Sequence, residues 1–328
     1  MHQMMKDAGI ALVMGLIMPA VLLGLVVSTS SREESQPKET APVLQTIQPT
    51  ETTATEEMVI TVQSGDGTVM TMDLCDYLTG VVLAEMPVSF EEEALKAQAV
   101  VARTYAIRAA TGASKHSDAA VCTISSCCQS YISPVEFQSK GGKAEDVERI
   151  RNYIAETGNQ VVTYEGKLIE ATYFSCSGGS TEDAVAVWGA DVPYLQSVES
   201  PGEEHASHYE DSVIFSAEEL ASKLGISATD KPSGWFGQTT YTEGGGVATM
   251  SIGGQVFSGT ELRKLLGLRS TAFHVECTDD SITIVTRGYG HRVGMSQYGA
   301  DAMAAGGSTY EEILAHYYQG AELTQYAD

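Results

Sequence analysis

Apolar and polar residues recur at two different periods along residues 58–328. Short apolar or alternating runs predict β-strands at residues 59–62, 69–74, 161–164, 168–174, 247–252 and 281–286. Runs with apolar residues three or four positions apart predict α-helices at residues 90–110, 147–157, 217–224, 259–266, 295–305 and 309–318. Strands and helices do not alternate as they do in βαβ units, so the pattern predicts an α+β fold.

Two of these helices follow a sequence that is typical of a capping box, in which side chains satisfy the free backbone N–H groups of the first turn. Ser89 is followed three residues later by Glu92, and Ser308 is followed three residues later by Glu311. We therefore expect a capping box at the start of both helices.

The N-terminal part of the chain has a different pattern. Residues 8–27 carry no charge, and at about 1.5 Å per residue a helix of this length crosses a hydrocarbon core of ~30 Å. No small-residue cleavage site of a signal peptide follows. The sequence therefore predicts that residues 1–28 are a retained, single-pass membrane anchor and that the C-terminal part lies outside the cytoplasm.

The rest of the chain divides into a linker and a folded part. Residues 29–57 are rich in Ser, Thr, Glu and Pro and predict a disordered linker, because they offer too little apolar surface to offset the entropy of folding. Residues 58–328 approach the size limit of a single hydrophobic core. Glycine and polar residues become frequent after residue 199, which predicts an inserted α+β subdomain at residues 200–286.

Charge excludes one class of partner. The chain has 43 Asp and Glu residues against 19 Lys and Arg residues, a net charge of −24. Because binding to nucleic acid depends on neutralising phosphates with cationic side chains, we expect no nucleic-acid partner.

Candidate chemistry begins at Glu85, in the segment LTGVVLAEMPVSF at residues 78–90, where we expect a strand-to-helix turn. Apolar residues flank Glu85 on both sides, and partial burial would favour the protonated carboxyl group that a general acid needs. The alternative is a solvated glutamate in front of a helix, the usual situation for this residue type. A second dense motif, GYGHRVGMSQYGA, occupies residues 288–300.

These two segments resemble the stage II sporulation protein D family, which are peptidoglycan lytic transglycosylases of endospore-forming bacteria, and the resemblance runs from about residue 58 to 323. It implies that Glu85 is the essential acid and base for cleavage between N-acetylmuramic acid and N-acetylglucosamine with formation of a 1,6-anhydro end. Ordinary glycoside hydrolysis takes two carboxylates. One suffices here, because the C6 hydroxyl of the muramic acid is the nucleophile.

The resemblance also implies a biological setting. It implies septal wall remodelling during engulfment, strands already stripped of peptides as substrate, and a place at the cell membrane of the forespore septum. The implied partners are the stage II sporulation proteins P and M.

Other residues are candidates for substrate binding. Lys96 and Arg103 lie seven residues apart on one face of a helix, although ion pairs with the acidic residues at 91–93 are an equal alternative. The segment TYFSCSGGST at residues 172–181 places Gly179 where a backbone can approach a ligand closely, although an ordinary turn is the default for two adjacent glycines. The resemblance gives Tyr173 and Ser177 supporting roles in substrate binding. Trp188 further on stacks on a sugar ring or fills core, and core is the commoner role.

The glycines at 288, 290, 294 and 299 indicate a looped backbone that aims His291, Ser296 and Gln297. A lone histidine of this kind is more often structural, but the resemblance places it at or beside the cleft. Arg292 departs from the family pattern, which has a small residue at this position.

A metal site is indicated by His116, Cys122, Cys127 and Cys128. The resemblance implies zinc held by His116, Cys122 and Cys128, with Cys127 spare and a fourth coordination position free. A disulfide is the competing interpretation. The remaining cysteines, Cys75, Cys176 and Cys277, are buried hydrophobes or reactive thiols.

Three rival functions stay open at this point. A non-catalytic amidase enhancer of the same superfamily binds glycan or an amidase without an acid. A zinc-dependent hydrolase uses the free position on the metal for a catalytic water. A nucleophilic pair of Cys176 and His291 requires the two side chains to lie within hydrogen-bonding reach.

Overall fold

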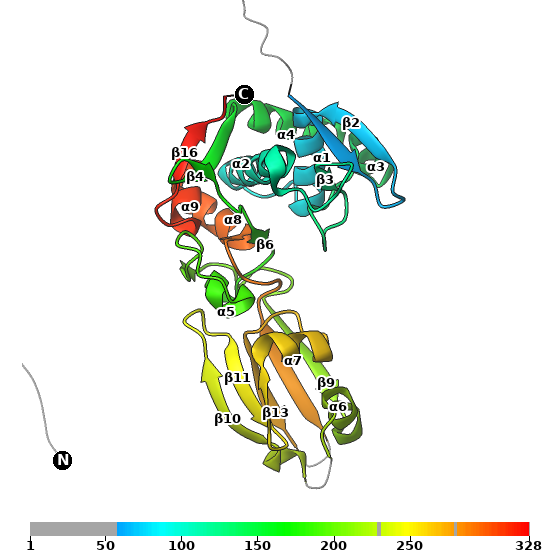
Figure 1. The fold of residues 1–328 in the computed structure, drawn as a ribbon, viewed down its shortest axis with the longest axis vertical. Coiled ribbons are helices and arrows are strands. Elements are labelled where there is room, and N and C mark those ends of the chain that lie inside the picture. Colours follow the sequence, from blue (N-terminus) through cyan, green and yellow to red (C-terminus); the bar gives the residue numbers. More distant parts are fainter. Residues whose placement is uncertain (1–57, 228–230, 279–280, 328) are drawn as a thin grey trace, which may run out of the picture. The chain divides into compact units, whose positions relative to one another are not determined.

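The computed structural model describes residues 58–227, 231–278 and 281–327, and it confirms a mixed α+β fold (Figure 1). Two hydrophobic cores organise these residues. The first gathers apolar side chains from residues 58–198 and 293–326. The second is built from residues 213–284, although the predicted domain boundaries at 200 and 286 stay a prediction.

Helix α2 (Glu92–Arg108) lies at the centre of the first core. Its alanines, among them Ala97, Ala99 and Ala102, are fully buried and let neighbouring elements approach closely. The elements packed around it are α1 (Leu74–Glu85), α4 (Ala144–Glu156), α8 (Gln297–Ala305), α9 (Tyr310–Tyr317) and β4 (Gln160–Tyr164). The C-terminal helices therefore complete a core that the N-terminal residues begin.

Three small sheets border this core. The first has the order β2 (Val69–Asp73), β1 (Val59–Gln63), β3 (Val121–Cys122), and the second has the order β16 (Glu322–Gln325), β4, β5 (Lys167–Leu168). In the third, β6 (Tyr173–Phe174) pairs in parallel with β15 (Met295–Ser296). This last pairing brings the two glycine-rich motifs of the sequence side by side.

The second core packs helices α6 (Ala217–Leu224) and α7 (Gly259–Leu266) with two antiparallel sheets (Figure 1). One sheet has the order β13 (Phe273–Cys277), β14 (Ile282–Arg287), β9 (Glu210–Phe215), and the other has the order β10 (Phe236–Tyr241), β11 (Val247–Ile252), β12 (Gln255–Ser258). The predicted bounds of α6, α7 and β11 are confirmed. The remaining elements are α3 (Pro134–Ser139), α5 (Ala184–Trp188), β7 (Gly179–Ser180), β8 (Glu199–Ser200), a π-helical turn (Ala109–Ala113) and a 3-10 turn (Pro232–Gly234).

The N-terminal part of the first core differs from the prediction. Glu85 ends helix α1 instead of lying at a strand-to-helix turn, and Asp73 caps this helix by accepting hydrogen bonds from the backbone of Cys75 and Asp76. The apolar run in α1 is buried on several sides, so its pattern did not show a helical period. The predicted strand at 168–174 is also broken into β5 and β6.

Both predicted capping boxes are wrong: the one at Ser89 is absent, and the one at Ser308 is shifted by one residue. Helix α2 has no side-chain cap, and the backbone N–H of Glu91 donates instead to Oδ1 of Asp301 at 2.7 Å, a contact between distant segments. In α9 the box is formed by Thr309 and Glu312, one residue later than expected.

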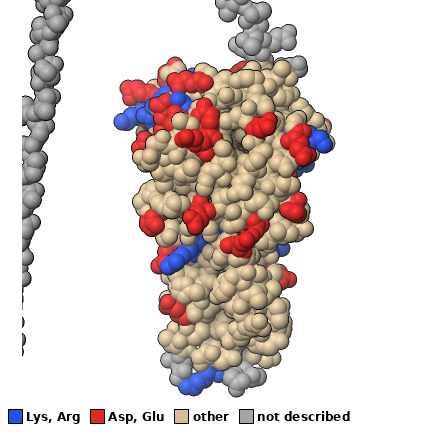
Figure 2. Space-filling view, turned by 90° about the vertical axis from the view of Figure 1, so that its left-hand side faces the viewer, with Lys and Arg blue, Asp and Glu red and all other residues tan. Residues whose placement is uncertain are grey.

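The expected single-pass membrane localisation is corrected. Within residues 58–227, 231–278 and 281–327, no helix is long and apolar enough to cross a bilayer. Residues 8–27, on which that prediction depended, and the predicted linker at 29–57 lie outside the described residues. On the face drawn in Figure 2, acidic side chains are scattered among uncharged ones and outnumber the basic ones.

Candidate active site

Several of the singled-out side chains converge on one open cleft of about 980 Å³. Glu85, Tyr173, His291 and Gln297 line it. The other lining residues are Tyr105, Lys115, Ser125, Ser126, Cys127, Cys128, Gln129, Ser130, Glu170, Ala171, Thr172, Phe174, Ser175, Trp188, Arg263, Tyr289 and Gly290. The cleft therefore joins the end of α1, the cysteine loop, both glycine-rich motifs and α7.

Glu85 is half-buried at the C-terminal end of α1, and its two carboxylate oxygens have different surroundings. Oε1 accepts a hydrogen bond of 2.6 Å from the backbone N–H of Ser130. Oε2 lies 3.5 Å from Nε2 of Gln297, which is also 3.4 Å from Oε1 of the buried Gln98. One oxygen is thus firmly held, and the other has only a long contact with an amide.

Tyr173 belongs to a chain of hydrogen bonds that begins in the core. The hydroxyl of Tyr77 donates to Oε1 of Gln129, and Nε2 of Gln129 donates to the Tyr173 hydroxyl, both at 3.1 Å. Burial, followed by the charge of Glu85, raises the pKa of Tyr173 well above its usual value. Tyr173 therefore stays neutral and keeps a proton to donate toward the carboxylate.

His291 is neutral in the cleft. Its Nδ1 accepts from the backbone N–H of Val293 at 3.1 Å, which leaves the proton on Nε2. The ring packs against Phe174 and Trp188, with centroid distances of 5.6 and 5.5 Å. Burial, with the positive charge of Arg263 as the second cause, lowers the pKa of His291 to about 4.

Two aromatic side chains are exposed where they line the cleft. Trp188 is 44% exposed and Tyr289 is 40% exposed. Trp188 therefore lies on the cleft surface instead of filling the core, and such rings offer apolar faces to a sugar.

Lys96 and Arg103 do not line this cleft, so their predicted substrate role is corrected to a structural one. Nζ of Lys96 forms ion pairs with Glu92, Glu93 and Glu156 at 2.5, 3.2 and 2.7 Å. The guanidinium of Arg103, 3% exposed, donates to the carbonyls of Ile154 and Gln160 and to Oγ1 of Thr157. Partly exposed glutamates therefore satisfy Lys96, and carbonyl and hydroxyl oxygens satisfy the buried Arg103.

Ser177 and Gly179 also lie outside the cleft lining. The buried Ser177 donates from its backbone N–H and its hydroxyl to the carboxylate of Glu203, at 2.6 and 2.8 Å. The thiol of Cys176 donates to the same carboxylate at 3.0 Å, and burial followed by the charge of Glu203 raises its pKa. Cys176 is therefore engaged with Glu203 and not with His291, so the proposed nucleophilic pair is wrong.

Ser296 is fully buried and has a structural position. Its hydroxyl accepts from the backbone N–H of Gly299 at 3.2 Å and caps α8. This cap fixes the start of the helix and, with it, the position of Gln297 beside Glu85.

Arg292, the departure from the family pattern, is buried with a φ of 67°. Its guanidinium pairs with the fully buried Glu182 at 3.0 Å and donates to the carbonyls of Ser177, Ser180 and Gly244, each at 2.7 Å. The side chain thus ties the Ser-Gly-Gly turn to the loop between β10 and β11.

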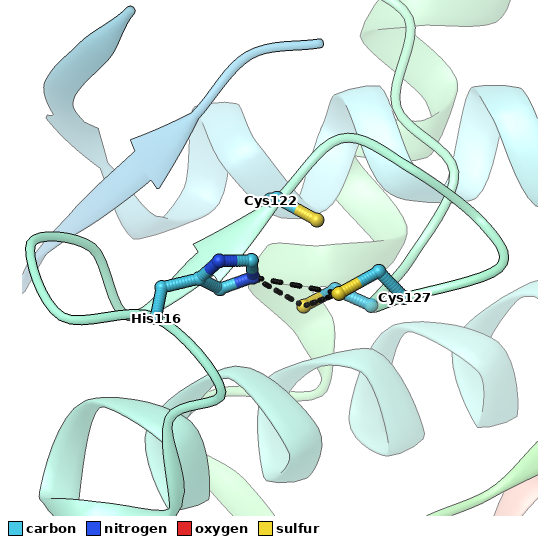
Figure 3. A group of neighbouring side chains, drawn as sticks. His116, Cys122 and Cys127 are labelled. Atoms are coloured by element: carbon cyan, nitrogen blue, oxygen red, sulfur yellow. Dashed lines mark hydrogen bonds between the residues drawn. The ribbon is translucent and has the colours of Figure 1, made fainter. Parts of the chain in front are cut away.

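The cysteine cluster has four members instead of three. The ligand atoms of His116, Cys122, Cys127 and Cys128 all lie within 4.8 Å of one another (Figure 3). Nε2 of His116 is 3.4 Å from Sγ of Cys128 and 3.6 Å from Sγ of Cys127. Cys127 is therefore not spare, and all six cysteines in the described residues are free thiols.

The thiol of Cys128 is poised to ionise. Burial by itself raises its pKa, but hydrogen bonds from Tyr105, from the backbone of Cys122 and from His116 outweigh burial and lower the pKa to about 7. A set of three thiols and one imidazole is a donor set typical of zinc.

Sequence reasoning did not single out several residues of the cleft. Ser130 contributes a backbone N–H, which leaves no signature in the residue type. Arg263 comes from α7, a predicted helix of the expected insertion in which no site residue was singled out, and Tyr289 lies between the glycines of its motif.

Comparisons with known proteins show the family of this chain. A family model described as Stage II sporulation protein matches residues 63–164. The chain is 40% identical over 268 residues to stage II sporulation protein D of Bacillus amyloliquefaciens, covering 80% of this chain and 77% of that protein. It is 38% identical over 267 residues to stage II sporulation protein D of Bacillus subtilis (strain 168), covering 80% and 78%.

A further relative carries a different name. The chain is 31% identical over 307 residues to the amidase enhancer of Bacillus subtilis (strain 168), covering 76% of this chain and 40% of that protein. The identity to the two sporulation proteins is higher than the identity to the amidase enhancer, and those alignments cover more than three quarters of this chain and of each relative. The chain belongs to the stage II sporulation protein D family.

Proposed function

We propose that this protein is a peptidoglycan lytic transglycosylase that cleaves between N-acetylmuramic acid and N-acetylglucosamine in peptide-stripped glycan strands. The observation that carries this proposal is the setting of Glu85 in the cleft. The other carboxylate of the cleft, Glu170, pairs with Arg108 at 3.3 Å, whereas Glu85 has no ion-pair partner among the described residues. A cleft with one free carboxylate suits a reaction in which the substrate supplies its own nucleophile.

The asymmetry of the Glu85 carboxylate assigns its two oxygens. Oε1 is occupied by the N–H of Ser130, so Oε2 is the oxygen that carries the proton. Oε2 protonates the glycosidic oxygen as its bond to C1 breaks, the C6 hydroxyl forms the new bond to C1, and the hydroxyl proton returns to Oε2. The carboxyl group is regenerated, and the product carries a 1,6-anhydro ring.

Tyr173 and Gln297 have supporting roles in this mechanism. The Tyr173 hydroxyl and the Gln297 amide are neutral donors beside the carboxylate, so they orient it without locking it in the ionised state as a cation would. Trp188 and Tyr289 supply stacking surface for the sugar rings.

Zinc fits the cysteine cluster. Three thiolates and the Nε2 of His116 form a set of four protein ligands, the arrangement of structural zinc sites, in which no position is left for water. When bound, zinc supplies structural cross-linking of the loop at residues 116–128. Because a zinc ion with four protein ligands has no position for a catalytic water, this ligand count favours a mechanism based on Glu85 over that of a zinc-dependent hydrolase.

A non-catalytic amidase enhancer is the second candidate, favoured by the similarity to the relative of that name. Such a protein binds glycan or an amidase through the same cleft and cuts nothing. The setting of Glu85 argues for the enzyme.

The family membership supports a biological setting for the enzyme. We infer that it acts in septal wall remodelling during engulfment, with the stage II sporulation proteins P and M as partners. An amidase partner provides the peptide-free strands on which this enzyme acts.

The test is mass spectrometry of amidase-treated glycan strands after incubation with the full chain or with its Glu85→Gln variant. The proposal predicts 1,6-anhydro ends with the wild type and none with the variant. Strand binding without any cleavage by folded wild type would support the enhancer instead.

A further inference from the structure

Arg263 is the one arginine of the described residues whose side chain has no hydrogen bond or ion pair to another described residue. It lies in the last turn of α7 and lines the cleft. Every other described arginine donates to a carboxylate or a carbonyl: Arg103, Arg108, Arg149, Arg151, Arg269, Arg287 and Arg292.

This lack of a partner is informative because the chain carries a net charge of −24. With carboxylates in such excess, a cation without one is unusual. Burial lowers the pKa of Arg263, so the guanidinium has lost part of its hydration and has gained no protein oxygen in return. It is free to bind an anion in the cleft.

The residues around Arg263 indicate which kind of ligand carries this anion. Its charge contributes to the lowered pKa of His291, so the guanidinium lies within electrostatic reach of that ring. The exposed rings of Trp188 and Tyr289 line the same cleft. The other lysine or arginine of the cleft lining, Lys115, is already engaged, since its Nζ donates to the carbonyl of Cys127 at 2.6 Å. A cation beside stacking surface is typical of a subsite for an acidic sugar.

On a peptidoglycan strand the acidic group is the lactyl carboxylate on C3 of N-acetylmuramic acid. While a stem peptide is attached, this group is a neutral amide, and removal of the peptide converts it to a carboxylate. The planar guanidinium fork matches a carboxylate with two parallel hydrogen bonds and cannot do so with an amide.

We propose that Arg263 binds the free lactyl carboxylate and makes the cleft selective for strands from which the peptide has been removed. This inference rests on the proposed function, because it takes the glycan strand as the ligand of the cleft. Arg263 is in this sense a specificity-determining residue, and Glu85 remains the reacting group.

The experiment compares two forms of one substrate: amidase-denuded strands, and the same strands with the lactyl carboxylate converted chemically to a methylamide. Cleavage is measured for the wild type, for Arg263→Gln and for Lys264→Gln. Lys264 is the matched control, because it is the exposed next residue of α7, carries the same charge and does not line the cleft.

The wild type and Lys264→Gln should both cleave denuded strands with a kcat/KM about 10- to 100-fold above that for methylamide strands, as expected for a charge-assisted hydrogen bond. Arg263→Gln should lose this preference and cleave both substrates at the lower value. Equal preference in Arg263→Gln and the wild type would overturn the inference while leaving the transglycosylase intact.

Binding separates the inference from the proposed function. Affinity is measured by calorimetry in the Glu85→Gln background for both substrates, with and without Arg263→Gln. A preference for denuded strands that depends on Arg263 supports the inference even if the wild type cleaves nothing. Equal affinity for both substrates when Arg263 is present would overturn it.

Discussion

The backbone N–H of Ser130 donates to Oε1 of Glu85 at 2.6 Å, and Ser130 follows Cys128 by two residues. The carboxylate is thus held by the loop that leaves the cysteine cluster. Any change that loosens the cluster should displace a hydrogen-bond donor of Glu85, so metal binding at the cluster and the activity proposed for Glu85 should be linked.

The first prediction concerns the number of metal ligands. Because the Sγ of Cys127 lies 3.6 Å from Nε2 of His116, we expect four ligands and one zinc per chain. Cys127→Ser should weaken zinc binding by about tenfold or more, since a thiolate is lost. A competition assay with a chromophoric chelator measures this.

Cys277→Ser is the matched control for that assay, because Cys277 is a free thiol of the second core. It should bind zinc as the wild type does. Unchanged affinity in Cys127→Ser would show a three-ligand site. Removal of zinc from the wild type should lower both the melting temperature and the cleavage rate, because the donor to Glu85 loses its support.

The second prediction is that Arg103 contributes to stability and not to substrate binding. Arg103→Met removes the donor to Oγ1 of Thr157 and to the carbonyls of Ile154 and Gln160, which should lower the free energy of unfolding by about 2–4 kcal/mol. Urea denaturation measures the loss, with the exposed Lys167→Met as control. KM of the folded fraction should be unchanged, and a raised KM with unchanged stability would restore the substrate role.

Elements that depend on the local sequence pattern could be predicted, whereas elements that depend on tertiary packing could not. The bounds of α6, α7 and β11 follow from local periodicity and turn residues, and they are confirmed. The helical state of α1 was missed, because its apolar run is buried on several sides and only the packing against α2 and α4 distinguishes it from a buried strand.

The candidate site shows the same division. Glu85, His291 and the cysteines were identified by residue type and motif. Glu92 and Glu93, as partners of Lys96, match the ion-pair alternative that the sequence offered. Glu156 and the acceptors of Arg103 could not be predicted, because they approach this helix only through tertiary packing. Ser130 contributes only its backbone N–H, and Arg263 was singled out because its side chain has no protein partner. Neither property can be predicted from the local sequence.

The third prediction concerns pH. The pKa of His291 is lowered to about 4, so between that value and the ordinary 6.5 the unfolded chain binds a proton that the folded chain does not. This contribution to stability is present above pH 6.5 and is lost as the pH falls toward 4. Its full size is about 3 kcal/mol at most.

Calorimetry from pH 7 to pH 4 measures this effect as the difference between the wild type and His291→Gln. The variant should lose less stability across this range, whereas the exposed His274→Gln should follow the wild type. Parallel curves for all three proteins would show that His291 is not held neutral.

The fourth prediction concerns the buried pair of Arg292 and Glu182. Glu182→Gln leaves a buried guanidinium without its counter-charge, and we expect a loss of about 3 kcal/mol in the free energy of unfolding. Arg292→Met should cost a similar amount. The double variant should cost clearly less than the sum of the two, and an additive result in a double-mutant cycle would mean that the two side chains are not coupled.

We propose that Glu85 catalyses an intramolecular attack in which water takes no part. Cleavage of denuded strands in water enriched with ¹⁸O, followed by mass spectrometry of the new ends, distinguishes this reaction from hydrolysis. We expect 1,6-anhydro ends free of ¹⁸O with the wild type and a rate lower by a factor of about 100 to 10,000 with Glu85→Gln. Reducing ends that carry ¹⁸O, made at equal rates by both proteins, would contradict it.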